Sequence, residues 1–501
     1  MDFFNSILLG FQVAVQPVNF FLAFLGCLMG TLVGVLPGLG PVAAISMLLP
    51  VSYQFTPVGA IIMLAGIYYG AMYGGSTTSI LVNIPGESAS VVTCLDGYQM
   101  AKQGKAGPAL AVAAIGSFIA GTLGIAGMAV FSPPLAKVAL SFGPPEYTSL
   151  TILGFMILTF LAKTSMAKAL LMAAFGLFLS TIGLDAVSGN TRFALSIKEL
   201  FDGVGLVPVA MGLFGISEVF LNLEEMRGRQ KVNLSKILNL FPTKEDWKKF
   251  VPASLRGTII GFFLGILPGG GAILSSFAAY GIEKRLSKYP EKFGTGVIEG
   301  VASPEAANNA AAQGSFIPLM TLGIPPNAVM AVLLGALMIH GITPGPLLIK
   351  NHPDLFWGLV ASMYMGNLML VILNLPLVGI WVQVLRIPYH ILFPLIILFC
   401  LVGVYSIDNS VVDIIIMIVF GLIGYFMKKT DYEGAPLILA LVLGGIFENA
   451  LRQSLMLSDG SLTIFFSRPI SLGFLIAAIF ILLIPFILGK KRLALGVDEG
   501  M

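Results

Sequence analysis

The chain has 501 residues, of which 57% are hydrophobic and only 11% are charged. A soluble protein carries roughly 25% charged residues, and apolar runs of about 17–25 residues recur here, so the composition predicts an all-α polytopic membrane protein. The net charge of +3 is too small to indicate nucleic acid as a partner. The three cysteines, Cys27, Cys94 and Cys400, have no metal-binding spacing.

In chain order, the first half begins with residues 3–16, an apolar segment that is too short to span a bilayer and is expected at its surface. Residues 18–52 are expected to form a re-entrant hairpin, because Pro37–Pro41 break the helix. Residues 57–95 form one long crossing that is interrupted near Ser76–Glu87. Four spans follow, at residues 108–132, 146–162, 167–184 and 203–221.

The sequence of the second half predicts the same order of elements as that of the first. Its re-entrant hairpin covers residues 251–281 and its interrupted crossing covers residues 297–341. Four spans follow, at residues 354–378, 388–405, 411–427 and 434–450, and a last span covers residues 470–488.

An internal repeat explains this order. The stretch Gly257–Gly271 reproduces the glycine ladder and the Pro-Gly-x-Gly break of Gly26–Gly40, and the Ile-Pro of Val82–Ser88 recurs in Leu322–Ala328. We therefore expect repeat 1 at residues 1–221, a cytoplasmic linker at 222–250, repeat 2 at 251–453, and a C-terminal span with a basic tail at 454–501.

The distribution of charge predicts the topology. The stretch Asn222–Arg256 holds eight Lys or Arg residues and four Asp or Glu residues, so the positive-inside rule places it in the cytoplasm. Each half has an odd number of crossings, and the two halves are therefore expected to insert with opposite orientation. Such an inverted-topology repeat is typical of secondary transporters.

The broken hairpins predict an anion site. A helix that starts inside the membrane has free N–H groups with partial positive charge, and these bind a carboxylate without any Lys or Arg. The glycines of the ladders, in contrast, are expected only to let helices pack closely. The residues expected to contact substrate at the breaks are Pro37, Gly38, Gly40, Gly269, Gly270 and Gly271.

The interrupted crossings add neutral hydroxyl and amide groups. The substrate contacts expected there are Ser76, Thr77, Thr78, Asn83, Asn308, Asn309 and Ser315. Freed carbonyls and one carboxylate suit a coupling ion, Na⁺ or H⁺, and the residues expected to bind it are Gly75, Asn83, Glu87, Gly314, Thr321 and Asn327. The alternative is that Ser and Thr bond to their own helix and Asn bridges helices.

Other carboxylates in apolar surroundings have less specific interpretations. Glu218 and Glu448 lie near span ends, where a charged side chain reaches the membrane surface. Asp96, Glu299 and Glu305 are expected to be charges of interfacial loops. No HExxH, GxSxG or Walker A pattern occurs, so a hydrolase or an NTPase is not indicated.

Four stretches carry a resemblance to a known family: GTLVGVLPGLGP, YGGSTTSILVNIPGES, GILPGGGAILSSFAAY and GIPPNAVMAVLLGAL. They resemble the TctA family, the large membrane subunit of tripartite tricarboxylate transporters, along essentially the whole chain. The resemblance implies a multi-pass protein of the bacterial inner membrane that imports citrate or another organic carboxylate by symport with an ion. It also implies a small TctB-like membrane subunit and a periplasmic TctC-like solute-binding protein as partners.

A looser likeness, to sodium/dicarboxylate symporters with two hairpins and two interrupted helices, suggests an elevator motion. No cofactor beyond the coupling Na⁺ or H⁺ is expected. A passive channel, or a transporter of another small anion, stays open as the alternative function.

Overall fold

The computed structural model describes residues 3–36, 40–160, 165–185, 188–225, 240–269, 271–385 and 389–488. These residues are almost entirely helical, and nine of their helices are long and apolar enough to cross a membrane. The prediction of an all-α polytopic membrane protein is therefore confirmed.

The helices of the first half are α1 (Phe3–Ala14), α2 (Pro17–Val35), α3 (Pro41–Ser52), α4 (Pro57–Val82), α5 (Val91–Lys102), α6 (Ala106–Ala139), α7 (Pro144–Phe160), α8 (Met166–Ser180), α9 (Leu206–Ala210) and α10 (Ser217–Glu225). Short elements between them are the 3-10 helices η1 (Ser88–Ser90) and η2 (Lys198–Leu200), the π-helix η3 (Met211–Ile216), and the paired strands β1 (Gly183–Leu184) and β2 (Thr191–Arg192).

The helices of the second half are α11 (Lys244–Ile266), α12 (Gly271–Leu286), η5 (Pro290–Lys292), α13 (Glu299–Gly314), α14 (Phe316–Leu322), α15 (Ala328–Ile339), α16 (Leu348–Asn351), α17 (Pro353–Asn374), α18 (Val378–Val384), α19 (Tyr389–Asp408), α20 (Val411–Lys429), α21 (Gly434–Leu457), α22 (Ile464–Ser467) and α23 (Pro469–Leu488).

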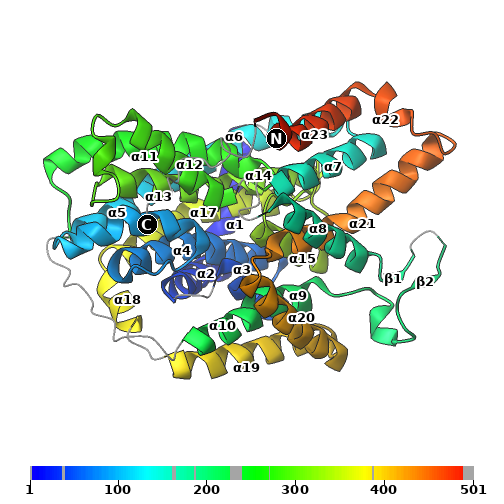
Figure 1. Ribbon diagram of the computed structural model, residues 1–501, viewed down its shortest axis with the longest axis horizontal. Helices are drawn as coiled ribbons and strands as arrows, with labels where there is room; N and C mark the ends of the chain where they lie inside the picture. Colours follow the sequence, from blue (N-terminus) through cyan, green and yellow to red (C-terminus); the bar gives the residue numbers. More distant parts are fainter. Residues whose placement is uncertain are drawn as a thin grey trace.

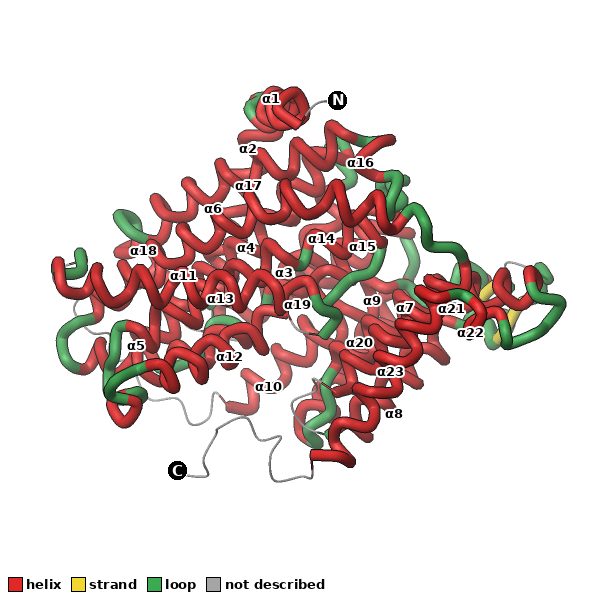
Figure 2. Tube along the Cα trace, turned by 90° about the horizontal axis from the view of Figure 1, so that it is seen from above, coloured by secondary structure: helices red, strands yellow, loops and turns green. Residues whose placement is uncertain are grey.

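Three groups of packed helices make up the molecule (Figure 1). The first consists of α2, α4, α5, α6, α11, α12, α13 and α17. The second consists of α7, α8, α21 and α23, and the third of α9, η3, α10, α19 and α20. Helices α3 and α15 contact each other and lie between the groups (Figure 2). Residues of both halves are thus mixed within each group.

The two glycine ladders make the same kind of contact. A Cβ atom added to Gly26 or Gly30 would lie within 2.5 Å of a carbonyl oxygen of α4, at Met63 or Ile67. A Cβ atom on Gly257 or Gly261 would likewise clash with carbonyls of α13. The backbones of α2 and α11 therefore lie directly against the crossing helix of their own half, as the small-residue interpretation of the ladders predicts.

The first crossing is interrupted later than predicted. Ser76 and its neighbours remain inside α4, which continues to Val82 and ends where Asn83 adopts a left-handed conformation with φ of 60°. Gly74 and Gly75 do not unwind the helix. They stay helical because the backbone of α2 lies against them, so that an added Cβ on Gly74 would be 2.3 Å from the Thr31 carbonyl oxygen.

The interruptions define four short segments that the rest of the description uses. The first break is residues 83–87, between α4 and η1, and the second break is residues 323–327, between α14 and α15. The first tip is residues 36–40, between α2 and α3, and the second tip is residues 267–271, between α11 and α12. Pro37, Gly38 and Gly270, which we expected at the tips, lie outside the described residues.

The two hairpins differ in how their second helix packs. Helix α12 lies along both α11 and α13. Helix α3 makes few contacts with α2 and packs instead on α4, α15 and α19. The first hairpin is therefore splayed, whereas the second is closed.

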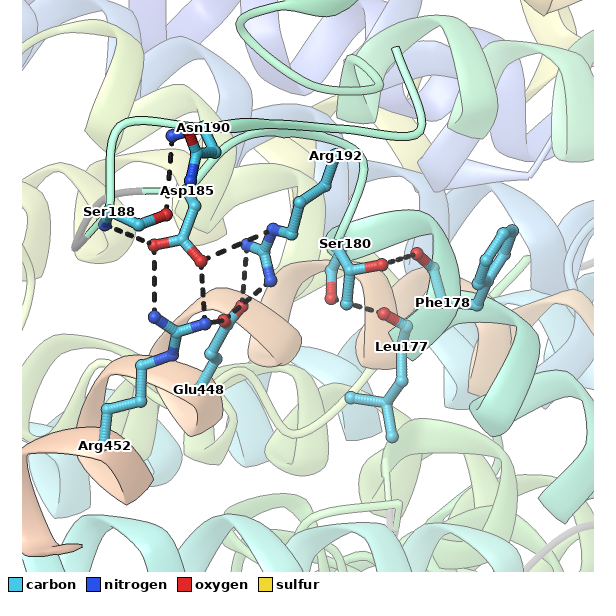
Figure 3. Close-up of polar contacts among 10 residues, drawn as sticks. Leu177, Phe178, Ser180, Asp185, Ser188, Asn190, Arg192, Glu448 and Arg452 are labelled. Atoms are coloured by element: carbon cyan, nitrogen blue, oxygen red, sulfur yellow. Dashed lines mark hydrogen bonds and ion pairs between the residues drawn. The ribbon is translucent and has the colours of Figure 1, made fainter. Parts of the chain in front are cut away.

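Ion pairs join the halves outside the helical core. The carboxylates of Asp185 and Glu448 each lie between the guanidinium groups of Arg192 and Arg452 (Figure 3). This cluster ties the segment containing β1 and β2 to α21. Glu218 pairs with Lys428, so both Glu218 and Glu448, the carboxylates expected near span ends, have a basic partner.

The glycine ladder yields a stability prediction. Gly261→Ala places a Cβ about 2.1 Å from the carbonyl oxygen of Ala307, and we expect a loss of ~1–3 kcal/mol or more, as for other overpacked sites. The midpoint of thermal unfolding in detergent measures this loss. The matched control is Gly281→Ala in α12, where no atom lies within 4 Å of the added Cβ and better helix propensity keeps or raises the midpoint. Equal midpoints for the two variants would contradict the packing argument.

Candidate functional site

A buried polar cluster lies where α4, α5, η1 and α13 meet. Its two carboxylates are Glu87, at the end of the first break, and Glu305, on α13; they are 7% and 0% exposed. Asn308 donates a hydrogen bond from Nδ2 to Glu87 Oε1 at 3.2 Å, and the backbone N–H of Ala89 donates to Glu87 Oε2 at 2.6 Å. The first break is thus held against α13 of the other half.

Glu305 is fully buried in this cluster, and the expectation of an interfacial loop charge is wrong. Ser76 Oγ donates to Glu305 Oε2 at 2.6 Å, and Thr93 Oγ1 donates to Glu305 Oε1. The carboxylate therefore joins α13 to α4 and α5. A sequence interpretation places Glu305 in a loop because it lies only six residues after the start of α13, but every residue of α13 from Gly300 to Gly314 is buried.

A second polar cluster lies at the second break. Asn327 donates from Nδ2 to Ser315 Oγ at 3.1 Å and to Tyr68 Oη at 3.4 Å, and its Oδ1 accepts the N–H of Met330 as the cap of α15. Ser315 Oγ also donates to the carbonyl of Gly265, the last glycine of the second ladder before the tip. The N–H of Gly269 donates to the carbonyl of Pro326 at 2.7 Å, so the second tip rests on the second break.

The two clusters contain corresponding pairs. At the offset that relates Val82–Ser88 to Leu322–Ala328, Glu87 corresponds to Asn327 and Tyr68 corresponds to Asn308. The hydrogen bonds from Asn308 to Glu87 and from Asn327 to Tyr68 therefore join corresponding positions, and each links one half of the chain to the other. Glu87 and Asn327 also both cap the helix that follows their break.

At the first tip, Thr78 Oγ1 donates at 2.7 Å to the carbonyl of Val35, the last residue of α2. Gly40 caps the start of α3, and an added Cβ there would meet no atom within 4 Å. The hydroxyl of Thr78 thus supplies a donor to a helix end that the tip leaves without one.

Other predicted residues are not brought into these clusters. Asn83 is exposed at the end of α4. Thr321 bonds to the Ile317 carbonyl of its own helix, and Gly314 packs against the Phe262 carbonyl. Gly75 lies inside α4, and its carbonyl accepts the hydroxyl of Ser79. The reason for expecting freed carbonyls at Gly75 therefore does not hold.

A small polar cavity lies beside the first cluster, between α4, α6 and α17. Its volume of about 10 Å³ is about that needed for one water molecule. Ser76 and Thr77 line it, and Tyr73, Leu110, Ala113, Ala114, Ser117 and Asn374 complete the lining. Sequence reasoning missed Ser117 and Asn374, because a single polar residue in an apolar span gives no signal without a break or a neighbour.

The clusters contain oxygen atoms in excess of donors. Among the described residues, the side-chain oxygens of Asn308, Asn309 and Gln313 are buried and have no hydrogen-bond partner. No basic side chain forms an ion pair with Glu87 or Glu305 in the described part of the chain. Carboxylate, amide and hydroxyl oxygens are the ligands of hard cations. The described residues contain no group of three or more His, Cys, Asp or Glu that could hold a metal ion.

Asp96 is a second buried carboxylate that the sequence interpretation placed in an interfacial loop. Its oxygens accept backbone N–H groups from Gly294, Gly296 and Val297, and the hydroxyl of Tyr280. These donors satisfy its charge locally. Asp96 therefore fixes α5 to the segment before α13 and has an architectural role.

The fold and the buried polar breaks define a polytopic membrane protein with its polar groups gathered inside the helical core. The chain matches the model of the tripartite tricarboxylate transporter TctA family over residues 20–439, and it belongs to this family. The predicted resemblance is thereby confirmed, and the chain is a membrane component of a transporter rather than a member of an enzyme family.

Two similar proteins come from Agrobacterium vitis. An uncharacterized 52.8 kDa protein in the TAR-I ttuC' 3'region is 51% identical over 494 residues, which cover 98% of each chain. An uncharacterized protein in the TAR-II ttuC' 3'region is 53% identical over 242 residues, which cover 48% of this chain and 100% of that protein. No solved structure matches the chain.

The second cluster yields a testable prediction. Asn327→Ala removes the cap of α15 and should cost about 1 kcal/mol of stability. Asn327→Asp keeps an oxygen for the Met330 N–H but removes the donor to Ser315, so its loss should be smaller. Thermal unfolding in detergent compares the two variants with the unchanged chain. Equal midpoints for all three would show that the observed hydrogen bonds do not stabilise the second break.

Proposed function

We propose that this chain is the permease subunit of an ion-gradient-driven importer of tricarboxylates or related organic carboxylates in a bacterial inner membrane. It works with a small TctB-like membrane subunit and with a periplasmic TctC-like solute-binding protein that delivers the substrate. One observation carries the proposal: two polar clusters lie at corresponding helix breaks inside an apolar helical core. Such breaks inside a membrane are tolerated where they line a site.

The two halves are inverted-topology repeats in this proposal. The equivalent contacts of the two glycine ladders support this arrangement. So does the exchange of partners between halves, since α6 packs on α13 while α17 packs on α4, and α8 packs on α21 while α20 packs on η3. The hairpins and interrupted crossings would carry substrate as one body in an elevator-type motion past the remaining helices.

The substrate carboxylates bind between the two tips and the two breaks. Helix α3 starts after Gly40 and helix α12 starts at Gly271, and the first N–H groups of these helices would bind the carboxylates. Thr77 lines the small cavity between α4, α6 and α17, and Asn309 donates to Ser117 of its lining. Neutral donors suit a substrate that must also be released, because a buried Lys or Arg would hold a polyanion tightly.

The function is tested by transport. The chain and its two partners are reconstituted in proteoliposomes, and uptake of labelled citrate is followed under an imposed Na⁺ gradient, an imposed pH gradient, or neither. We expect accumulation under one of the gradients and its loss when an ionophore dissipates that gradient. Equal uptake rates with and without gradients, at channel-like speed, would instead favour a passive pore.

The site is tested by substitution. Asn309→Ala and Thr77→Val should each lower the uptake rate by about tenfold or more, because each removes a polar contact in a buried site, and neither should lower the amount of chain in the membrane. The matched control is Ser454→Ala in α21, whose hydroxyl bonds only to the Ala450 carbonyl of its own helix. Normal transport by both site variants would show that the substrate binds elsewhere.

A further inference from the structure

Glu305 has an electrostatic problem that the hydrogen bonds around it do not solve. It is fully buried, and a buried carboxylate without a basic partner is costly unless a proton or a cation neutralises it. The charged and titratable groups on the neighbouring elements do not help. Glu87 is another acid, Cys94 is a thiol, Asp96 bonds to backbone N–H groups, and Arg256 pairs with Glu283.

The helix that bears Glu305 presents further unpaired acceptors on the same side. Glu305, Asn309 and Gln313 follow one another at four-residue spacing, so they form one stripe along α13. Asn309 Nδ2 donates both to the Glu305 carbonyl at 3.1 Å and to Ser117 Oγ at 2.7 Å. The oxygens of Asn309 and Gln313 remain without a donor. This stripe is rich in acceptors and poor in donors, as a cation site is.

The small cavity gives this stripe contact with a water-sized space. Ser76 lines the cavity and donates to Glu305, and Ser117 lines the cavity and accepts from Asn309. Ser76 Oγ also lies 3.4 Å from the Met72 carbonyl oxygen. If Glu305 Oε2 carries a proton, that O–H donates to Ser76 Oγ, and the hydroxyl hydrogen of Ser76 turns to Met72. One hydroxyl therefore serves both charge states of the carboxylate.

We propose that Glu305 binds one monovalent cation, a proton or Na⁺, which reaches it through the cavity lined by Ser76 and Ser117. This site is distinct from the group of residues at the breaks that we expected from the sequence to bind the coupling ion. This inference rests on the proposed function only for the role of the cation, which is to couple carboxylate import to an ion gradient. Binding itself is a property of the chain alone and is measured without transport.

The first experiment follows the thermal unfolding of the purified full-length chain in detergent. If the bound cation is Na⁺, the unfolding midpoint should be higher in NaCl than in choline chloride. If it is a proton, the midpoint should rise as the pH is lowered, because burial makes the native state bind this proton more tightly than the unfolded state does. The Glu305→Gln variant should lose whichever of these two responses the unchanged chain shows. The matched control, Glu146→Gln, replaces a buried carboxylate that pairs with Arg468. This control should keep the response of the unchanged chain.

Two further variants keep the proposal falsifiable. Ser76→Ala should raise the Na⁺ or proton concentration that gives half of the midpoint shift by about tenfold. This variant tests the site if Glu305→Gln does not fold. The proposal is overturned if Glu305→Gln keeps the full response, or if Glu87→Gln alone abolishes it. A chain that responds to neither ion also overturns it.

Transport then separates this inference from the proposed function. With partners in proteoliposomes, Glu305→Gln should still exchange labelled for unlabelled citrate across the membrane but should not accumulate it under a gradient. Gradient-driven accumulation at the unchanged rate would refute the role of Glu305 while leaving the importer intact. If the unchanged chain moves no carboxylate while its cation response at Glu305 is present, the proposed function fails and the cation site stands.

Discussion

The close approach of two helix backbones is the constraint on which the rest of the structure depends. The glycines of α2 let its backbone lie against α4, and those of α11 let its backbone lie against α13. Carbonyl oxygens of α4 and α13 occupy the positions that side chains on these glycines would need. This contact keeps α4 helical past Gly75 and brings the end of α2 to the hydroxyl of Thr78. Because each ladder ends at a tip, the tips lie beside the breaks of the crossing helices. The polar clusters follow from this placing.

The second consequence is electrostatic. The breaks bring carboxylates and amides into a core whose described residues offer them no basic partner. The ion pairs of the described residues involve other carboxylates, as in the cluster of Asp185, Arg192, Glu448 and Arg452 (Figure 3). In the proposed function, Glu305 binds the cation and the helix starts bind the substrate carboxylates. Adjacent sites for an anion and a cation would suit symport.

The sequence predicted the order and type of the helices because apolar length and Pro-Gly breaks are local signals. It placed the first break within Ser76–Glu87, although the break begins only at Asn83. It did not predict that Ser76 remains helical, because that depends on the backbone of α2 lying against Gly74 and Gly75. It misplaced Glu305 and Asp96, since a carboxylate near a helix end looks the same in sequence whether solvent or a neighbouring helix covers it. Ser117 and Asn374 gave no signal at all.

The central claim, that substrate binds between the tips and the breaks, is tested most directly by protection of a single cysteine from alkylation. Asn83 is exposed in the first break, so Asn83→Cys, in a chain with its native cysteines replaced by serine, reports on that space. The account predicts that the transported carboxylate with its coupling ion slows alkylation at this position, while a cysteine in place of Lys105, which is also exposed, reacts at an unchanged rate. An alkylation rate at position 83 that substrate leaves unchanged would contradict the account.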